Sequence, residues 1–102
     1  MLVHNVFFSL KDRQPEARDK LVTACRKYLT DHPGVVFFAC GTLAEALKRD
    51  VNDRNFDVAV HVVFEDVAAH DRYQASPRRK EFVGKHQSNW KQVRVFDSLT
   101  PR

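Results

Sequence analysis

His4 is the side chain of this sequence that best suits proton transfer. It interrupts an otherwise apolar run between Leu2 and Phe8. Imidazole has an ordinary pKa close to neutral pH, so it can both take up and release a proton there. By alternation along a strand, His4 shares its side with Val6 and Phe8, where we expect the helices to pack. His4 is therefore either a general base in a pocket or a hydrogen-bonded core histidine.

Tyr73 and Arg79 are two further polar residues with chemical potential. Tyr73 ends an apolar helical stripe with Val67 and His70, so it either packs in the core or presents its hydroxyl to a ligand. Arg79 cannot accept a proton near neutral pH. Its guanidinium can hold a carboxylate or enolate oxygen through paired N–H donors, which would indicate an anionic ligand. The alternative for Arg79 is a solvated helix surface.

The other histidines and the two cysteines form no recognisable metal or redox motif. His32, His70 and His86 show neither HxH nor HxxxH spacing, and Cys25 and Cys40 lack CxxC spacing. A metal site built from distant positions needs a convergence that spacing does not show. We therefore predict no metal ligands, no bound cofactor and two buried, reduced thiols.

The pattern of apolar residues predicts the elements that must position these side chains. A strand over Leu2 to Leu10 precedes a helix with Pro15 in its first turn, which ends before the His-Pro-Gly sequence at positions 32–34. A second strand covers Val35 to Cys40, between two glycines. Leu43 to Asn55 is rich in turn formers, and we predict a variable connection there.

The second half of the chain predicts a strand, a broken helix and a final strand. Phe56 to Phe64 is apolar on both alternating sets, so both faces of this strand are expected to be buried. A helix from Glu65 runs through Tyr73, the Ser-Pro pair at 76–77 breaks it, and a second piece reaches about His86. The final strand is predicted over Trp90 to Phe96.

This order predicts an α+β fold, the ferredoxin-like β-α-β-β-α-β sandwich with both helices on one sheet face. A chain of 102 residues has room for one core, so residues 1–102 are predicted to form a single domain. Phe7, Ala59, Val63 and Phe96 fall on the other, open face, an apolar area too large to leave in water. We expect two copies to pack through this face as a homodimer, with His61 at the interface.

Three segments carry a resemblance to a known family: Leu2 to Phe8, Phe56 to Asp66, and Val93 to Asp97. Together with the linker from Tyr73 to Pro77, they resemble the stress-responsive α/β-barrel domain family, abbreviated Dabb. The resemblance implies a ferredoxin-like fold whose sheets pack across a two-fold axis into a dimeric α+β barrel. It implies no single function, because the family includes stress-induced plant proteins, a cofactor-independent polyketide cyclase and many bacterial members of unknown role.

The resemblance also implies candidate catalytic residues. In cyclase-type members a tyrosine and histidines surround a pocket between helices and sheet; Tyr73 matches the tyrosine, and His4 matches the histidine of the first strand. The His-Pro-x-His motif of these members reads Ser-Pro-Arg-Arg at positions 76–79, so Ser76 and Arg79 replace both histidines. Any proton transfer next to a carbonyl would then use His4 as base, with Tyr73 or Arg79 steadying the oxyanion.

We predict a pocket between helices and sheet that binds a small, partly apolar ligand able to carry negative charge. His4 and Tyr73 are the candidate catalytic residues. Cofactor-independent chemistry, cyclase-like or monooxygenase-like, and a stress-related structural role without chemistry stay open as alternatives. The predicted ligand-binding residues are Val6, Phe8, Val60, Val62, Arg79, Phe82, Trp90 and Val95.

Charge and composition argue against a nucleic-acid-binding or membrane protein. The net charge is +4, but acidic and basic residues interleave, and the basic cluster from Arg78 to Lys80 fits a solvated helix face. The third strand offers Ala59, His61 and Val63 where an RNA-binding sheet needs stacking rings. Leu2 to Phe8 is too short for a membrane span and lacks signal-peptide features. We therefore expect no specific nucleic acid, no membrane and a cytoplasmic location.

Overall fold

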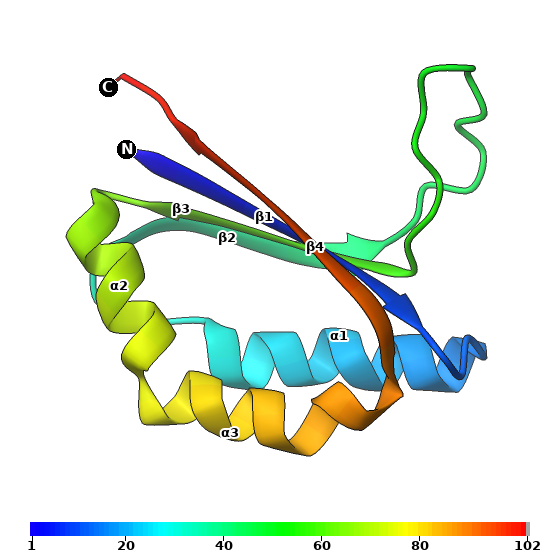
Figure 1. Ribbon diagram of the computed structural model, residues 1–102, viewed down its shortest axis with the longest axis horizontal. Helices are drawn as coiled ribbons and strands as arrows, with labels where there is room; N and C mark the ends of the chain where they lie inside the picture. Colours follow the sequence, from blue (N-terminus) through cyan, green and yellow to red (C-terminus); the bar gives the residue numbers. More distant parts are fainter. Residues whose placement is uncertain (102) are drawn as a thin grey trace.

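Four antiparallel strands form one sheet, and three helices cover one of its faces (Figure 1). The computed structural model describes residues 1–101. Its strands are β1 (Leu2–Leu10), β2 (Val35–Thr42), β3 (Val58–Phe64) and β4 (Trp90–Leu99). Its helices are α1 (Pro15–Leu29), α2 (Val67–Ala75) and α3 (Pro77–His86), with a 3-10 turn, η1 (Gln87–Asn89), before β4. The order confirms the ferredoxin-like α+β fold, with the second helix split in two.

The strand order is β2-β3-β1-β4, so β1 and β3 occupy the centre of the sheet. In this register His4 of β1 pairs with Val62 of β3 on one side and with Asp97 of β4 on the other. Directly paired residues share a face of the sheet. His4 and Asp97 therefore share the face that the helices cover, as their contacts below confirm.

Three strand boundaries differ from the sequence prediction. β3 begins at Val58 rather than Phe56, because its pairing with β1 starts at Phe8 and Val58; the ring of Phe56 packs on that of Phe7, 5.0 Å between centroids. β2 continues to Thr42 because it pairs with β3 that far. β4 continues to Leu99 because its pairing with β1 extends to Leu2.

The break between α2 and α3 is built from local capping. Asp66 caps α2 by accepting a hydrogen bond from the backbone N–H of Ala69 at 2.8 Å. Ser76 ends α2 through its own N–H and caps α3 by accepting from the N–H of Arg79 at 3.2 Å. Pro77 then occupies the first turn of α3, where its missing N–H is harmless. Ser76 thus fixes the angle at which Tyr73 and Arg79 reach the sheet.

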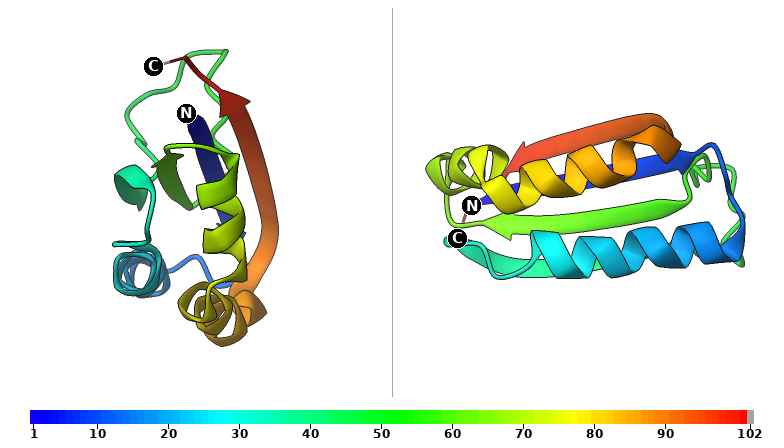
Figure 2. Two further views of the ribbon diagram at one scale, coloured as in Figure 1. Left: turned by 90° about the vertical axis from the view of Figure 1, so that its left-hand side faces the viewer. Right: turned by 90° about the horizontal axis from the view of Figure 1, so that it is seen from below.

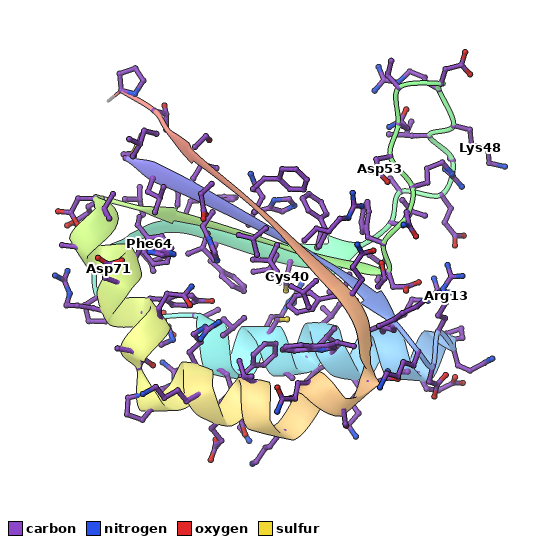
Figure 3. All side chains as sticks on the ribbon, viewed as in Figure 1. Arg13, Cys40, Lys48, Asp53, Phe64 and Asp71 are labelled. Atoms are coloured by element: carbon purple, nitrogen blue, oxygen red, sulfur yellow. The ribbon has the colours of Figure 1, made fainter. Side chains whose placement is uncertain are left out.

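The core lies between the sheet and the helices. Figure 2 shows α1 and α3 running side by side across one face of the sheet. Cys25 on α1 is fully buried, whereas Cys40 on β2 is half-buried rather than buried, with its Sγ facing α1 (Figure 3). The largest fully buried side chains are Phe64, Leu10, Val58, Val60, Val62 and Cys25.

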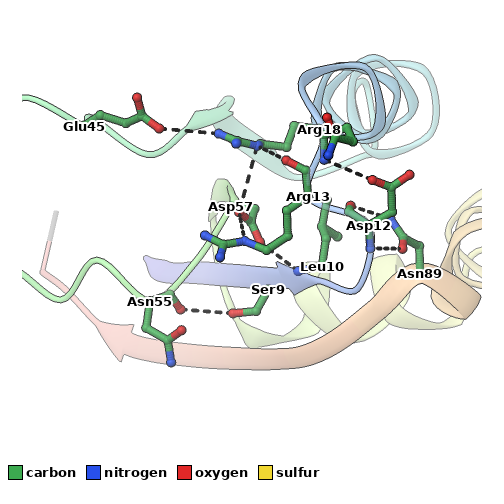
Figure 4. Close-up of polar contacts among 10 residues, drawn as sticks. Ser9, Leu10, Asp12, Arg13, Arg18, Glu45, Asn55, Asp57 and Asn89 are labelled. Carbon is green, nitrogen blue, oxygen red and sulfur yellow. Dashed lines mark hydrogen bonds and ion pairs between the residues drawn. The ribbon is translucent and has the colours of Figure 1, made fainter.

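A polar cluster anchors one end of the sheet to the loop before α1 (Figure 4). The buried carboxylate of Asp57 accepts hydrogen bonds from the N–H of Leu10 at 2.8 Å and from Nε of Arg13 at 3.0 Å. Asn89 and Asp12 form two hydrogen bonds beside it: the N–H of Asp12 donates to Oδ1 of Asn89, and Nδ2 of Asn89 donates to the carbonyl of Asp12. Because a buried carboxylate must be hydrogen-bonded, this cluster fixes how the chain leaves β1.

The open face of the sheet carries exposed aromatic rings. Phe37 and Phe96 are 55% and 54% exposed, and Phe7 packs against Phe96 with 5.8 Å between centroids. Ala59 and Val63 share this face, buried and half-buried. The connection between β2 and β3 projects beyond the sheet, away from the helices (Figure 1). None of the helices in the described part of the chain has the length and apolarity that a membrane crossing requires.

Candidate functional site

A cavity of about 360 Å³ lies between the sheet and the helices α2 and α3. Three of its lining residues come from β1, four from β4 and the others from β3, α1, α2 and α3, so the fold brings distant parts of the chain together. The sequence-predicted residues around it are His4, Val6, Phe8, Val60, Tyr73, Arg79, Phe82, Trp90 and Val95.

Val62 is the one predicted residue that does not line this cavity. It lies on the helix-covered face, paired with His4, but its side chain is completely buried in the core. Alternation along a strand predicts the face on which a residue lies. It does not predict which part of that face the helices cover. In this structure Val62 is buried in the core, whereas Val60 lines the cavity.

His4 is buried and paired with a carboxylate. Its Nδ1 lies 2.5 Å from Oδ1 of Asp97, so this nitrogen donates its proton to the carboxylate and Nε2 keeps a free lone pair. Burial lowers the pKa of His4 below its ordinary value of 6.5, and the hydrogen bond and charge of Asp97 oppose that effect in part. His4 is thus neutral and oriented at neutral pH, the state in which it can accept a proton or bind a metal.

Tyr73 is buried beside His4 at the same end of the cavity. Its ring makes edge contacts with the rings of His4, His32 and Phe64, with centroids 6.2, 5.0 and 5.1 Å away. Burial raises the pKa of Tyr73 well above its ordinary value of 10. Its hydroxyl therefore stays protonated and can donate a hydrogen bond, whereas it cannot serve as a base at neutral pH.

Arg78 and Arg79 have different environments although they are adjacent on α3. Arg78 is exposed and donates to the carbonyls of Thr30 and Lys27 at the end of α1, at 3.0 and 2.7 Å. Arg79 is half-buried and lines the cavity, and its Nη1 makes only a long contact, 3.4 Å, with the carbonyl of Gln74. The guanidinium of Arg79 is therefore available to a ligand.

His70 and Asp97 also line the cavity, and the sequence prediction did not include them among the site residues. The ring of His70 lies 5.1 Å from that of His4. Two signals could have indicated them. His70 lies one helical turn before Tyr73, and antiparallel pairing of the first and last strands can place Asp97 opposite His4.

Aromatic and aliphatic side chains form the other end of the cavity. Trp90 packs against Phe8 and Phe82, with centroids 4.8 and 5.6 Å away. The indole N–H of Trp90 is buried and has no hydrogen-bond partner within residues 1–101. Val93 and Val95, which also line the cavity, are 40% and 49% exposed. The cavity thus has an apolar end that opens along β4 and a polar end formed by His4, Tyr73 and Arg79.

Comparisons with solved structures agree with this fold. A Dabb family protein with a ferredoxin-like fold from Mesorhizobium loti is 20% identical, with TM-score 0.80, over 99% of this chain and 97% of that one. A dimeric ferredoxin-like protein of unknown function from Thermobifida fusca is 17% identical, with TM-score 0.78, over 97% and 90%. A hydroxynitrile lyase from Passiflora edulis is 21% identical, with TM-score 0.76, over 98% and 93%.

The sequence itself supports a closer assignment than these structural similarities. No curated protein sequence matches the chain. The model of one family, the stress responsive A/B barrel domain, matches residues 2–99. This match covers nearly all of the chain, and it agrees with the strand segments and the linker that resemble the same family. The chain belongs to the stress responsive A/B barrel domain (Dabb) family.

Proposed function

We propose that the chain is a single-domain protein that forms a homodimer through the open face of its sheet and binds a small, partly apolar anion in the cavity beside Arg79. The observation that carries this proposal is the combination of an apolar cavity with a guanidinium that has no charged partner among residues 1–101. A planar guanidinium favours carboxylate and enolate oxygens.

The apolar end of the cavity fits a ring or a short hydrocarbon segment. Phe8, Phe82 and Trp90 offer flat surfaces, and aromatic side chains of this kind provide much of the contact area in small-molecule sites. The indole N–H of Trp90 is closed off from solvent, so the ligand is expected to contact the face of this ring and not its N–H.

The polar end fits the charged group of the ligand. Arg79 supplies positive charge and paired donors, and the hydroxyl of Tyr73 supplies one neutral donor. Tyr73 lies before the break at Ser76 and Arg79 lies after it, and the helix caps hold this break in a fixed geometry. We therefore expect preference for an anionic ligand over a neutral compound of the same shape.

Cofactor-independent proton transfer is a second candidate function, and the hydrogen-bonded pair of His4 and Asp97 favours it. A neutral imidazole oriented by a carboxylate is a typical general base. In such a reaction Nε2 of His4 would take a proton from a carbon next to a carbonyl, while Tyr73 or Arg79 would stabilise the enolate oxygen. The fold of a hydroxynitrile lyase resembles this one, and this likeness supports an enzymatic role as the second candidate.

The ligand class is tested with two probes of matched shape, 3-phenylpropionate and 3-phenylpropanamide. The chain has one tryptophan, so a single indole N–H signal in ¹⁵N-correlated NMR spectra reports on the cavity wall. The titration is done with metal-free protein in the presence of EDTA. We expect the carboxylate to shift this signal at lower concentration than the amide. Equal affinity for both probes, or no shift with either, would contradict the proposal.

A further inference from the structure

Three side chains that commonly bind metals meet at the polar end of the cavity. His4 lies on β1, His70 on α2 and Asp97 on β4, and one ligand atom from each lies within 4.8 Å of the other two. Two imidazole nitrogens and one carboxylate oxygen form the donor set of many zinc sites and of non-haem iron(II) sites. We propose that these three residues bind one divalent transition-metal ion.

A neighbouring carboxylate prepares His70 for this role. Nδ1 of His70 lies 3.1 Å from Oδ1 of Asp71, which is labelled on α2 in Figure 3. With its proton on Nδ1, His70 keeps the lone pair of Nε2 for a metal, the arrangement found behind most metal-bound histidines. Nε2 of His70 is 3.4 Å from the side-chain nitrogen of Gln74. That contact is long enough for a metal ion to replace it.

His4 and Asp97 need only a small movement to bind the same ion. Their facing atoms, Nδ1 and Oδ1, are 2.5 Å apart, whereas two donors on one zinc ion lie about 3 Å apart because each is about 2 Å from the metal. The side chain of Asp97 is 42% exposed, so it has room to turn. The ion would bind Nδ1 of His4 in place of its proton, and the imidazole would stay neutral by carrying that proton on Nε2.

The acidic residues around the site favour binding of a metal cation, and Arg79 then favours binding of an anion beside it. The carboxylates of Asp97 and Asp71 together balance the two positive charges of the ion. Arg79 lines the same cavity and has no acidic partner within the described residues. Three protein ligands also leave coordination positions open.

An anionic group of the ligand can therefore bridge the ion and Arg79. This last step rests on the proposed function, whereas metal binding itself does not. In the metal-bound protein His4 is a ligand of the ion, so it does not act as a general base.

Metal binding is tested without any organic ligand. The protein is purified with EDTA, exchanged into chelator-free buffer and titrated with Co²⁺, whose visible absorption reports nitrogen and oxygen coordination, and then with Zn²⁺. We expect one ion per chain. His70→Ala and Asp97→Asn should weaken binding at least about 100-fold, since the first removes one of three ligands and the second replaces a charged oxygen ligand by a neutral one. His86→Ala is the matched control, because His86 lies on α3 outside the cluster, and it should bind like the wild type.

The wild-type protein provides a readout that needs no substitution. Bound Zn²⁺, which is diamagnetic, should shift the ring signals of His4 and His70 in NMR spectra and leave those of His61, on the open face, nearly unchanged. Absence of Co²⁺ binding at millimolar concentration, or binding that His70→Ala leaves intact in a folded protein, would overturn the proposal. The phenylpropionate titration in EDTA is independent of this result, so failure of the metal site and failure of the cavity proposal are distinguishable.

Discussion

At the scale of single residues, two opposing effects set the protonation state of His4: its burial and its hydrogen bond to the carboxylate of Asp97. Burial disfavours the imidazolium, Asp97 favours it, and burial is the larger effect. Tyr73, beside it, is held in its protonated form by the same burial. The polar end of the cavity therefore presents a neutral acceptor on His4, a neutral donor on Tyr73 and a cation on Arg79, with the carboxylate of Asp97 hydrogen-bonded to His4. This combination can bind an anion without first transferring a proton.

The first prediction concerns the pKa of His4 in metal-free protein. NMR titration of its ring protons should give a pKa below 6.5. Asp97→Asn should lower the pKa further, because the carboxylate that stabilises the imidazolium is lost while burial remains. A wild-type pKa above 6.5, or a rise on Asp97→Asn, would contradict this account.

The same shift gives a pH dependence of stability with a definite sign. Because the pKa of His4 is lower in the folded chain than in the unfolded chain, the unfolded chain binds more protons between the two values. The contribution of neutral His4 to the free energy of unfolding is fully present above pH 6.5, and it is lost as the pH falls through the pKa of His4 in the folded chain. Urea unfolding of wild type and His4→Gln should therefore show that part of the acid destabilisation disappears in the variant.

At the scale of elements, the turn from α1 into β2 must bring β2 close to α2. Gly34 has φ +83°, and a Cβ built there would lie 2.4 Å from Cβ of Ala69. Only glycine combines this backbone conformation with so close an approach. The start of β2 can therefore lie against α2, the helix that carries His70 and Tyr73.

Gly34→Ala is predicted to destabilise the fold by about 2 kcal/mol or more, since it adds both backbone strain and a steric clash. Chemical unfolding measures the loss. Gly84→Ala on α3 is the control: a Cβ there meets nothing within 4 Å, and alanine in a helix should stabilise by about 0.5 to 1 kcal/mol. Equal effects of the two substitutions would show that the contact with Ala69 is unimportant.

The elements also show how far the sequence alone could predict this protein. Strand and helix periods predicted the four strands, the helices and the break at Ser76, because those signals are local, but not the 3-10 turn η1. They missed that β4 continues to Leu99 and that Val62 is sealed in the core, since both depend on how strands pair and helices cover the sheet. The meeting of His4, His70 and Asp97 depends on the same long-range geometry. Helical spacing and strand pairing indicate His70 and Asp97 separately, but neither signal predicts that all three side chains come together.

At the scale of the whole molecule, the two faces of the sheet have different roles. One face holds the core and the cavity, and the other presents the rings of Phe7, Phe37 and Phe96. Exposed aromatic rings gathered on one face favour protein association. The solved relative from Thermobifida fusca is dimeric, which supports the proposal that two copies of this chain pack through the open face.

Phe96→Lys is predicted to convert the proposed homodimer into a monomer, because it buries a charge in the proposed interface. Light scattering coupled to gel filtration measures the change from twice the chain mass to the chain mass. Val67→Lys is the matched control, since Val67 is also exposed but lies on α2. A dimer that survives Phe96→Lys unchanged would place the interface elsewhere.

The binding of an anion beside Arg79 is the central claim, and the dissociation constant of 3-phenylpropionate for three metal-free proteins tests it most directly. The proteins are the wild type, Arg79→Met and Lys80→Met, where Lys80 is an exposed neighbour on the same helix. A charge-assisted hydrogen bond contributes about 1.5 to 3 kcal/mol, so Arg79→Met should weaken binding roughly 10-fold to 100-fold. Lys80→Met should bind like the wild type. Equal dissociation constants for wild type and Arg79→Met would contradict the account.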